Sequence, residues 1–261
     1  MFKKLMVILT LLVVQNTLAK VTTETVTYKD GEAELEGFIS YDKNLIKNKK
    51  APAVVVVHDW MGVGEYVKMR AEQLASMGYV AFVADIYGKG NLPKDTKEAA
   101  AISGKFKDGD RKLLRSRAEA AFNELKKSNY VDTNKISATG YCFGGTTALE
   151  MARMGLPLKG VVSFHGGLTS VKPEDAKNIK AKVLVLHGAI DPFVPLKEVE
   201  QFQKELNDAK VDYQFVAYSG AVHSFTQKHA GDDISKGAAY NEAADKRSFV
   251  AAKIFLEDVS K

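Results

Sequence analysis

Short, uninterrupted apolar runs recur along the chain, and amphipathic stretches separate them. Continuous apolar runs are typical of strands covered on both faces, as in a parallel sheet. Apolar residues at helical spacing predict helices between them. The predicted strands are 53–57, 79–84, 135–139, 160–164, 182–186 and 213–218, and the predicted helices are 66–77, 111–127, 146–154 and 196–208. This alternation predicts an α/β fold with a mostly parallel central sheet and helices on both faces.

The N-terminal region has a different pattern. Residues 22–27 and 33–40 alternate apolar and polar positions on either side of Asp30 and Gly31. Alternation around an Asp-Gly pair is typical of a β-hairpin, so we expect an antiparallel hairpin at one edge of the sheet. No repeat or linker-like composition interrupts the chain, and residues 20–261 are therefore expected to form one domain.

The first nineteen residues are typical of a targeting segment. Lys3 and Lys4 precede an apolar run over 5–14, and small residues follow at Thr17 and Ala19. A basic start, a short apolar run and small residues at −3 and −1 indicate a secretory signal peptide, residues 1–19. The run is shorter than the ~20 apolar residues that span a bilayer. We therefore expect an exported protein, periplasmic or secreted, without a stable membrane anchor after cleavage.

Charge and cysteine content narrow the function further. The chain has 37 Lys and Arg against 32 Asp and Glu. Removal of Lys3 and Lys4 with the signal peptide leaves 35 against 32, a formal charge of +3. This small, dispersed excess does not indicate a nucleic-acid partner. Because Cys142 is the one cysteine, an exported form would fold without an internal disulfide.

That cysteine lies in residues 140–145 (GYCFGG), between a predicted strand and a predicted helix. Glycines two residues before and after a nucleophile are typical of a strand-turn-helix elbow, which exposes the side chain on a strained backbone. The start of the following helix would also stabilise a thiolate. On this hexapeptide alone, a buried structural cysteine remains the alternative interpretation.

Reactive side chains follow most of the predicted strands, at the edge where an open α/β sheet binds its ligand. A thiol nucleophile needs an imidazole base, and the imidazole needs a carboxylate that fixes its tautomer. Cys142, Asp191 and His223 stand in the chain order nucleophile, acid, histidine that is typical of α/β-hydrolases. We therefore predict that these three residues form a catalytic triad.

The other histidines are interpreted differently. His165 and His187 directly precede glycines at strand ends and are predicted to be packed or hydrogen-bonded. His229 lies in a polar loop, where we expect it to be solvated. The histidines lack the close paired spacing of a metal site, and the thiol already has a predicted role. We expect no metal and no cofactor.

Five blocks of sequence resemble the dienelactone hydrolase family, in the family's order, over about residues 30–257. They are 58–62 (HDWMG), 85–88 (DIYG), 140–145 (GYCFGG), 191–195 (DPFVP) and 220–225 (GAVHSF). The resemblance implies an α/β-hydrolase fold on which Cys142 attacks an ester or lactone and forms a thioester that water hydrolyses. It also implies that the backbone N–H groups of Phe143 and Trp60 hold the oxyanion. Asp59 stands where the family often carries a glutamate that contacts the thiol, and aspartate is one methylene shorter.

The predicted substrate site departs from the founding members of that family. They hold a substrate carboxylate with two arginines, whose positions here are occupied by Lys89 and Gln227. Glutamine has no charge, and lysine does not reproduce a bidentate arginine clamp. The predicted substrate contacts are Tyr87, Lys89, Phe193 and Phe225, with Trp60 beside them. The aromatic residues favour a neutral or hydrophobic acyl group over dienelactone itself.

The sequence thus predicts an exported enzyme that hydrolyses a small ester or lactone, with a small molecule as its partner and its oligomeric state left open. Two alternatives stay open at this point. One is a secreted binding protein that keeps the fold without turnover. The other is a thioesterase or acyl-transfer enzyme with the same nucleophile, because neither the fold nor the triad determines the acyl group.

Overall fold

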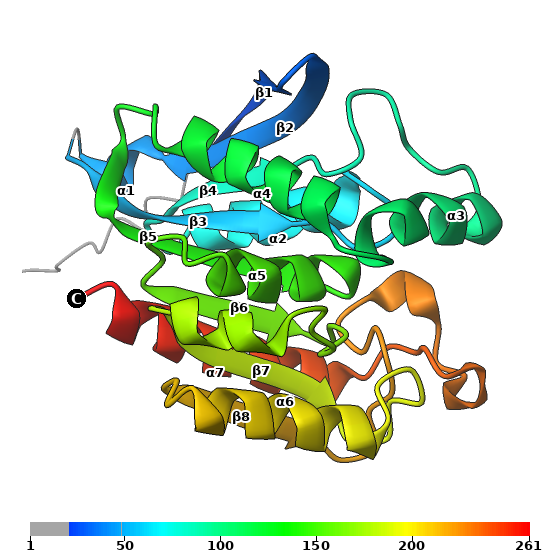
Figure 1. Cartoon of the computed structure of the whole chain (residues 1–261). Coiled ribbons are helices and arrows are strands. Elements are labelled where there is room, and N and C mark those ends of the chain that lie inside the picture. The colour runs from blue at the N-terminus through cyan, green and yellow to red at the C-terminus, as the bar shows by residue number, and fades with distance from the viewer. Residues whose placement is uncertain (1–20, 48) are drawn as a thin grey trace, which may run out of the picture.

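The computed structural model of the protein describes residues 21–47 and 49–261. All eight strands in this part of the chain belong to one sheet, and helices lie against both of its faces (Figure 1). The predicted signal peptide, residues 1–19, lies outside the described residues. Within the described ranges, no helix is both long enough and apolar enough to cross a bilayer.

The sheet is mixed, with a parallel majority. Its strands are β1 (Val21–Asp30), β2 (Ala33–Asp42), β3 (Ala51–Val57), β4 (Val80–Ala84), β5 (Val131–Tyr141), β6 (Gly160–Phe164), β7 (Lys182–Gly188) and β8 (Tyr213–Tyr218). They lie in the order β1-β2-β4-β3-β5-β6-β7-β8. The strands from β3 to β8 run parallel, whereas β1 pairs antiparallel with β2 and β2 with β4. The predicted fold class and the predicted edge hairpin are therefore confirmed.

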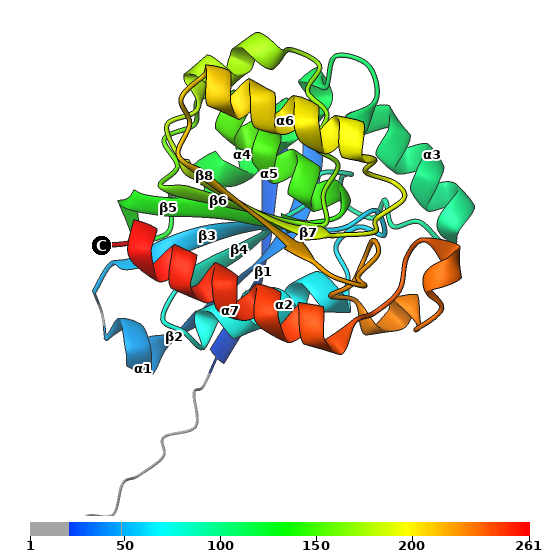
Figure 2. The ribbon, with the colours of Figure 1, turned by 90° about the horizontal axis from the view of Figure 1, so that it is seen from below.

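The continuous apolar runs are buried from both sides. In β3, Val54 and Val56 belong to the core on one face and Val55 and Val57 to the core on the other, and all four are fully buried. Figure 2 shows the helices that cover these faces. One face carries α4 (Lys112–Leu125), α5 (Phe143–Arg153) and α6 (Leu196–Asp208), and the other carries α2 (Glu65–Ala75) and α7 (Glu242–Val259).

Three helices were not predicted from the sequence: α1 (Lys43–Ile46), α3 (Thr96–Lys107) and α7. The buried face of α7 includes Ala244, Ser248 and Ala252, whose small side chains weaken the apolar periodicity. Its start does carry a local signal, because the side chain of Asn241 accepts a hydrogen bond from the Ala244 N–H at 3.0 Å. Capping residues would have located this helix better than hydrophobic spacing.

The carboxyl ends of the parallel strands meet at one edge of the sheet, to the right in Figure 1. Beyond that edge lie α3 and the segment that carries the short helices η2 (Lys228–Ala230) and η3 (Ile234–Lys236). The remaining short helix, η1 (Pro173–Asn178), follows β6. The strand ends therefore provide the floor of a site, and segments far apart in the sequence provide its walls.

Candidate active site

Cys142 lies between β5 and α5, as the residue that caps the helix. Its φ of +55° and ψ of −115° are uncommon for a residue with a side chain and place it on a strained backbone. The Cys142 N–H donates to the Phe164 carbonyl at 3.0 Å and to His165 Nδ1 at 3.1 Å. The turn thus directs the side chain away from the sheet while its own N–H is held by β6 and the residue that follows it.

The two glycines of the elbow are required by close backbone contacts. A Cβ on Gly140 would lie 2.0 Å from the carbonyl oxygen of Gly144, and a Cβ on Gly144 would lie 2.2 Å from that of Val57. Neither distance is tolerated, and neither neighbour is a flexible side chain. The strand β5, the start of α5 and the end of β3 therefore pack backbone to backbone at the nucleophile.

Asp191 and His223 follow β7 and β8 and meet beside Cys142. His223 Nδ1 lies 2.8 Å from Asp191 Oδ2, and the second oxygen of Asp191 accepts a hydrogen bond from the Phe193 N–H at 2.9 Å. The Asp191 side chain is fully buried. Because Asp191 occupies Nδ1, His223 Nε2 is the ring nitrogen left for the thiol, and His223 and Cys142 line the same cavity. The structure thus brings the three predicted triad residues together.

The environment of His223 favours its charged form. Burial acts to lower its pKa, but the charge of Cys142 and the hydrogen bond to Asp191 outweigh burial and raise the pKa of His223 to about 10. At neutral pH the imidazole therefore holds a proton near the sulfur. A protonated imidazole in this position can stabilise the thiolate that acts as a cysteine nucleophile.

Two backbone N–H groups near the thiol are free to bind an anion. Phe143 is the first residue of α5, and Trp60 lies in the loop after β3. Within the described ranges, neither N–H donates a hydrogen bond. Both residues line the same cavity as Cys142 and His223. Free N–H groups at a helix start and an adjacent loop are suited to hold the oxyanion of an acyl-transfer reaction.

The Asp59 side chain is buried, and both oxygens of its carboxylate accept hydrogen bonds from groups other than the thiol. Its Oδ1 accepts from the Met61 N–H at 2.7 Å, and its Oδ2 accepts from Gln227 Nε2 at 2.5 Å. No hydrogen bond between Asp59 and Cys142 is present among residues 21–47 and 49–261. Gln227, at a position where the founding family members hold a substrate carboxylate, instead supports Asp59 from inside the protein.

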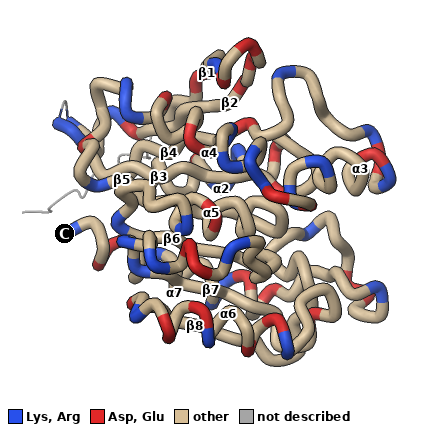
Figure 3. The backbone as a smooth tube through the Cα atoms, viewed as in Figure 1, with Lys and Arg blue, Asp and Glu red and all other residues tan. Residues whose placement is uncertain are grey.

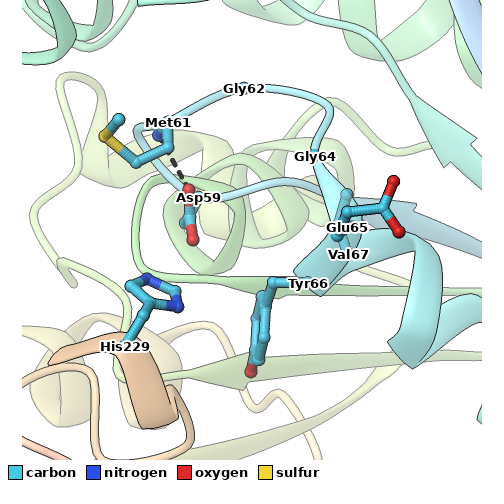
Figure 4. A pocket seen from close by; sticks show the side chains of 8 residues that line it. All are labelled: Asp59, Met61, Gly62, Gly64, Glu65, Tyr66, Val67 and His229. Atoms are coloured by element: carbon cyan, nitrogen blue, oxygen red, sulfur yellow. Dashed lines mark hydrogen bonds between the residues drawn. The ribbon is translucent and has the colours of Figure 1, made fainter. Parts of the chain in front are cut away.

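Figure 4 shows a second, smaller cavity that Asp59 borders, of about 210 Å³. Its lining comprises Asp59, Met61, Gly62, Gly64, Glu65, Tyr66, Val67 and His229. The exposed His229 ring lies edge-on to Tyr66, with ring centroids 5.9 Å apart, which agrees with its predicted position near solvent. Cys142 and His223 do not line this cavity, so it is separate from the thiol site.

The cavity over the thiol has a volume of about 590 Å³. Its lining includes four aromatic and aliphatic side chains: Trp60, Phe143, Phe193 and Val194. It also includes five charged side chains, which we call the charged wall: Lys107, Asp108, Arg111, Glu198 and Lys236. Figure 3 shows charged residues of both signs in α3, which contributes Lys107, and over the rest of the backbone. This cavity is large enough for a small organic substrate and combines an apolar region with a polar one.

Three of the four predicted substrate contacts lie outside that cavity, which corrects the expectation for them. Lys89 turns back to β2, where its Nζ pairs with Glu34 at 2.7 Å and Glu36 at 3.3 Å. Phe225 is fully buried against His165. Tyr87 is also buried, and its hydroxyl donates to the Trp60 carbonyl at 3.0 Å, so it supports the loop that carries Trp60. Phe193 alone of the four lines the cavity.

The sequence analysis did not predict that these charged side chains line the cavity. Arg111 is buried, and its guanidinium donates to Glu150 at 3.0 Å and to the Thr169 carbonyl at 2.7 Å. The same fully buried Glu150 also pairs with Arg115 and Arg153. No local sequence signal marks Arg111, because its partners Glu150 and Thr169 lie far away in the chain. The hydrogen bonds to these two residues hold the Arg111 guanidinium in place.

The remaining strand-end histidines are buried. Burial lowers the pKa of His58 and His187, so both rings are neutral. His58 Nε2 accepts from the Ile86 N–H at 3.2 Å, and the His187 ring packs on Phe215. The packed ring of His187 fits the prediction made for it. In the described part of the chain, no group of three or more His, Cys, Asp or Glu is placed to hold a metal ion.

Comparisons with known proteins agree with this fold. The model of the dienelactone hydrolase family matches residues 39–260. A solved structure called m3DLH is 36% identical, has a TM-score of 0.88, and covers 92% of this chain and 99% of its own. A dienelactone hydrolase-like promiscuous phosphotriesterase from metagenomic libraries is also 36% identical over the same shares, with a TM-score of 0.85. A probable 2-oxo-3-(5-oxofuran-2-ylidene)propanoate lactonase from Bradyrhizobium sp. is 29% identical over 79% of this chain and 87% of its own length.

Proposed function

The chain belongs to the dienelactone hydrolase family and is an ester or lactone hydrolase, and we propose that Cys142 is its nucleophile, with His223 as base and Asp191 as the orienting acid. The observation that carries the proposal is that Cys142 and His223 line the same cavity, while Asp191 is hydrogen-bonded to His223 Nδ1 at 2.8 Å. The strained φ of Cys142 supports it, because strain is retained where surrounding structure and function require it.

In the first half of the reaction, the Cys142 sulfur attacks the carbonyl carbon of the substrate and forms a carbon–sulfur bond. The carbonyl oxygen becomes an oxyanion, which the N–H groups of Phe143 and Trp60 stabilise. When the carbon–oxygen bond breaks, His223 gives its proton to the departing alcohol. The product is a thioester on Cys142, and in a lactone the alcohol stays attached to the acyl group.

In the second half, water attacks the thioester. His223 Nε2 takes a proton from the water, and the carbon–sulfur bond breaks as the second oxyanion collapses. The acid is released and the sulfur returns to its pair with the protonated imidazole. Throughout both halves, the carboxylate of Asp191 keeps the proton on Nδ1, so that Nε2 always faces the thiol and the substrate.

The lining of the cavity supports a substrate with a neutral acyl group next to the thiol. Trp60, Phe143 and Phe193 line the same cavity as Cys142, and neither of the two family arginine positions supplies a charge there. Lys89 pairs with two glutamates elsewhere, and Gln227 binds Asp59. We propose a small ester or lactone with an apolar acyl part, hydrolysed in the periplasm or outside the cell after removal of residues 1–19.

The two alternative functions share this site. A binding protein without turnover would not need the free N–H groups, the strained elbow and the imidazole–carboxylate pair together. A thioesterase or acyl-transfer enzyme would use the same thioester and would differ only in its leaving group or its acceptor. The supporting features therefore favour an enzyme and leave the acyl donor to be assayed.

Hydrolysis of p-nitrophenyl acetate, p-nitrophenyl butyrate and a simple lactone by residues 20–261 tests the proposal. Wild type is compared with Cys142→Ala under reducing conditions, after mass spectrometry has shown an unoxidised thiol. Thr139→Ala is a matched control, because it removes a buried hydroxyl from the same strand. We expect turnover in wild type and control and its loss in Cys142→Ala. Turnover that survives in Cys142→Ala would disprove the nucleophile.

A further inference from the structure

His165 contacts the elbow at the backbone N–H of Cys142 rather than at the thiol. It follows β6, is fully buried and has φ +39°, and its own N–H donates to the Leu186 carbonyl at 2.8 Å. Its Nδ1 lies 3.1 Å from the Cys142 N, and its Nε2 lies 2.8 Å from Thr226 Oγ1. The ring therefore joins the backbone of the nucleophile to the loop that follows His223.

The contacts of His165 determine which of its nitrogens carries the proton. A backbone N–H is only a donor, so Nδ1 must present a lone pair to Cys142. The ring proton is then on Nε2 and is donated to Thr226. Thr226 Oγ1 lies 2.6 Å from the Tyr66 hydroxyl, which also accepts from Arg70 Nε at 3.2 Å. This chain of hydrogen bonds anchors the tautomer to α2.

Every charged group that faces His165 opposes its protonation. Burial is the main cause that lowers its pKa well below the usual range, and the positive charges of His223 and Arg70 act in the same direction. No carboxylate pairs with either ring nitrogen among residues 21–47 and 49–261. Protonation would also place an N–H opposite the Cys142 N–H. His165 is thus held neutral, with its ring edge-on to His223 at a centroid distance of 5.3 Å.

We propose that His165 is a positioning residue for the chemistry of Cys142, and the inference rests on the nucleophile proposed above. The strained φ of Cys142 is energetically unfavourable and must be held by its surroundings. His165 Nδ1 and the Phe164 carbonyl are the two acceptors that hold its N–H. By fixing that peptide, and by packing against His223, His165 keeps the sulfur against Nε2 and the Phe143 N–H toward the cavity.

Two substitutions separate the hydrogen bond from the packing. His165→Asn keeps an acceptor oxygen near the place of Nδ1, and asparagine tolerates a positive φ. His165→Leu keeps much of the volume and removes both polar contacts. His187→Asn is the matched control, because His187 is also a buried strand-end histidine but makes no hydrogen bond to Cys142.

The main measurement is the pH profile of alkylation by iodoacetamide. Cys142 is the sole cysteine, so the rate reports this thiol alone and does not require turnover. In folded His165→Leu, we expect the ratio of the alkylation rate at pH 7 to the rate at pH 10 to be at least about fivefold lower than in wild type. We also expect kcat/KM for p-nitrophenyl acetate to fall roughly 10–100-fold, as for other residues that orient a reacting group. For His165→Asn, both quantities should stay within about threefold of wild type, since asparagine keeps the acceptor. The control His187→Asn should stay within the same range.

A residue with only a structural role would lower the melting temperature without moving the alkylation profile. Folded His165→Leu with a wild-type profile and kcat/KM within about twofold would therefore overturn the proposal. If His165→Leu does not fold, Thr226→Val decides. The Thr226→Val substitution removes the partner of Nε2, so the ring proton of His165 can move to Nδ1. We expect the pH profile of alkylation to shift in the same direction as in His165→Leu, by a smaller amount. An unchanged alkylation profile would overturn the proposal. Failure of the nucleophile assignment would appear separately, as turnover by Cys142→Ala.

Discussion

Two histidines lie beside the Cys142 elbow in opposite protonation states: His223 is protonated and His165 is neutral. On the thiol side, Asp191 and Cys142 overcome burial and raise the pKa of His223 to about 10. On the peptide side, burial keeps the pKa of His165 well below its usual range, and nearby cations act with it. The rings are only 5.3 Å apart. The partners of each ring, more than its depth in the protein, decide which one can move a proton.

This contrast assigns different tasks to the two histidines. His223 meets a carboxylate and a sulfur, so it can hold and return a proton during a reaction. His165 contacts a backbone donor and a hydroxyl, which fix its tautomer, so it can position the Cys142 peptide but does not exchange a proton. Substitutions that remove one partner at a time test this division, and the expected effects decrease in the order given below.

The largest effect is expected from His223→Asn. Asparagine can still donate to Asp191, but it has no atom in the place of Nε2. We expect kcat/KM for p-nitrophenyl acetate to fall about 10³–10⁴-fold, near the upper range for loss of a general base. His187→Asn, the same change at a neighbouring strand end, should remain close to wild type. More than a tenth of wild-type activity in His223→Asn would contradict the role of this ring.

Asp191→Asn should have the next largest effect. The remaining carbonyl oxygen would keep the bond from the Phe193 N–H, so the amide NH₂ would face His223 Nδ1. That contact forces the ring proton to Nε2 and removes the base, and we expect kcat/KM to fall about 10²–10³-fold. Circular dichroism should show an intact fold. A loss under tenfold would mean that the carboxylate does not control the tautomer.

Gln227→Leu should act on stability more than on turnover. It removes the donor to the buried Asp59 Oδ2 and leaves that oxygen unpaired. We expect the free energy of unfolding in urea to fall by about 1–3 kcal/mol. Gln201→Leu, on the exposed face of α6, is the control and should change it by less than about 0.5 kcal/mol. Equal stabilities of the two variants would show that the Asp59 contact is dispensable.

The smallest effect is expected from pH. A folded-state pKa raised from 6.5 to about 10 means that His223 stabilises the fold fully below pH 6.5 and that this contribution is lost as pH rises through about 10. The stability difference between wild type and His223→Asn should therefore shrink between pH 7 and pH 11. After subtraction of spontaneous hydrolysis, kcat/KM should fall about tenfold between pH 10 and pH 11, as for loss of one proton. A flat profile to pH 11 would contradict the charged state of His223.

The predicted strands and the elbow were found from local pattern, because their causes are local. Continuous apolar runs identify strands buried on both faces, and the glycines at 140 and 144 reflect contacts at 2.0–2.2 Å that exclude a Cβ. The chain order of Cys142, Asp191 and His223 was likewise visible. The misses were α1, α3, α7 and the charged wall, where short length, small residues or distant partners leave weak local signals.

The sequence by itself determined the α/β architecture, the family resemblance and the three residues of the proposed triad, because backbone geometry and chain order restrict residue types within short windows. Only the tertiary structure decided which side chains line the cavity. It placed Lys89 against β2, buried Phe225, and joined Gln227 to Asp59 across 168 residues of chain. It also brought His165 Nδ1 to the Cys142 N–H. Such contacts depend on how packed elements approach one another, and no short window of sequence contains both partners.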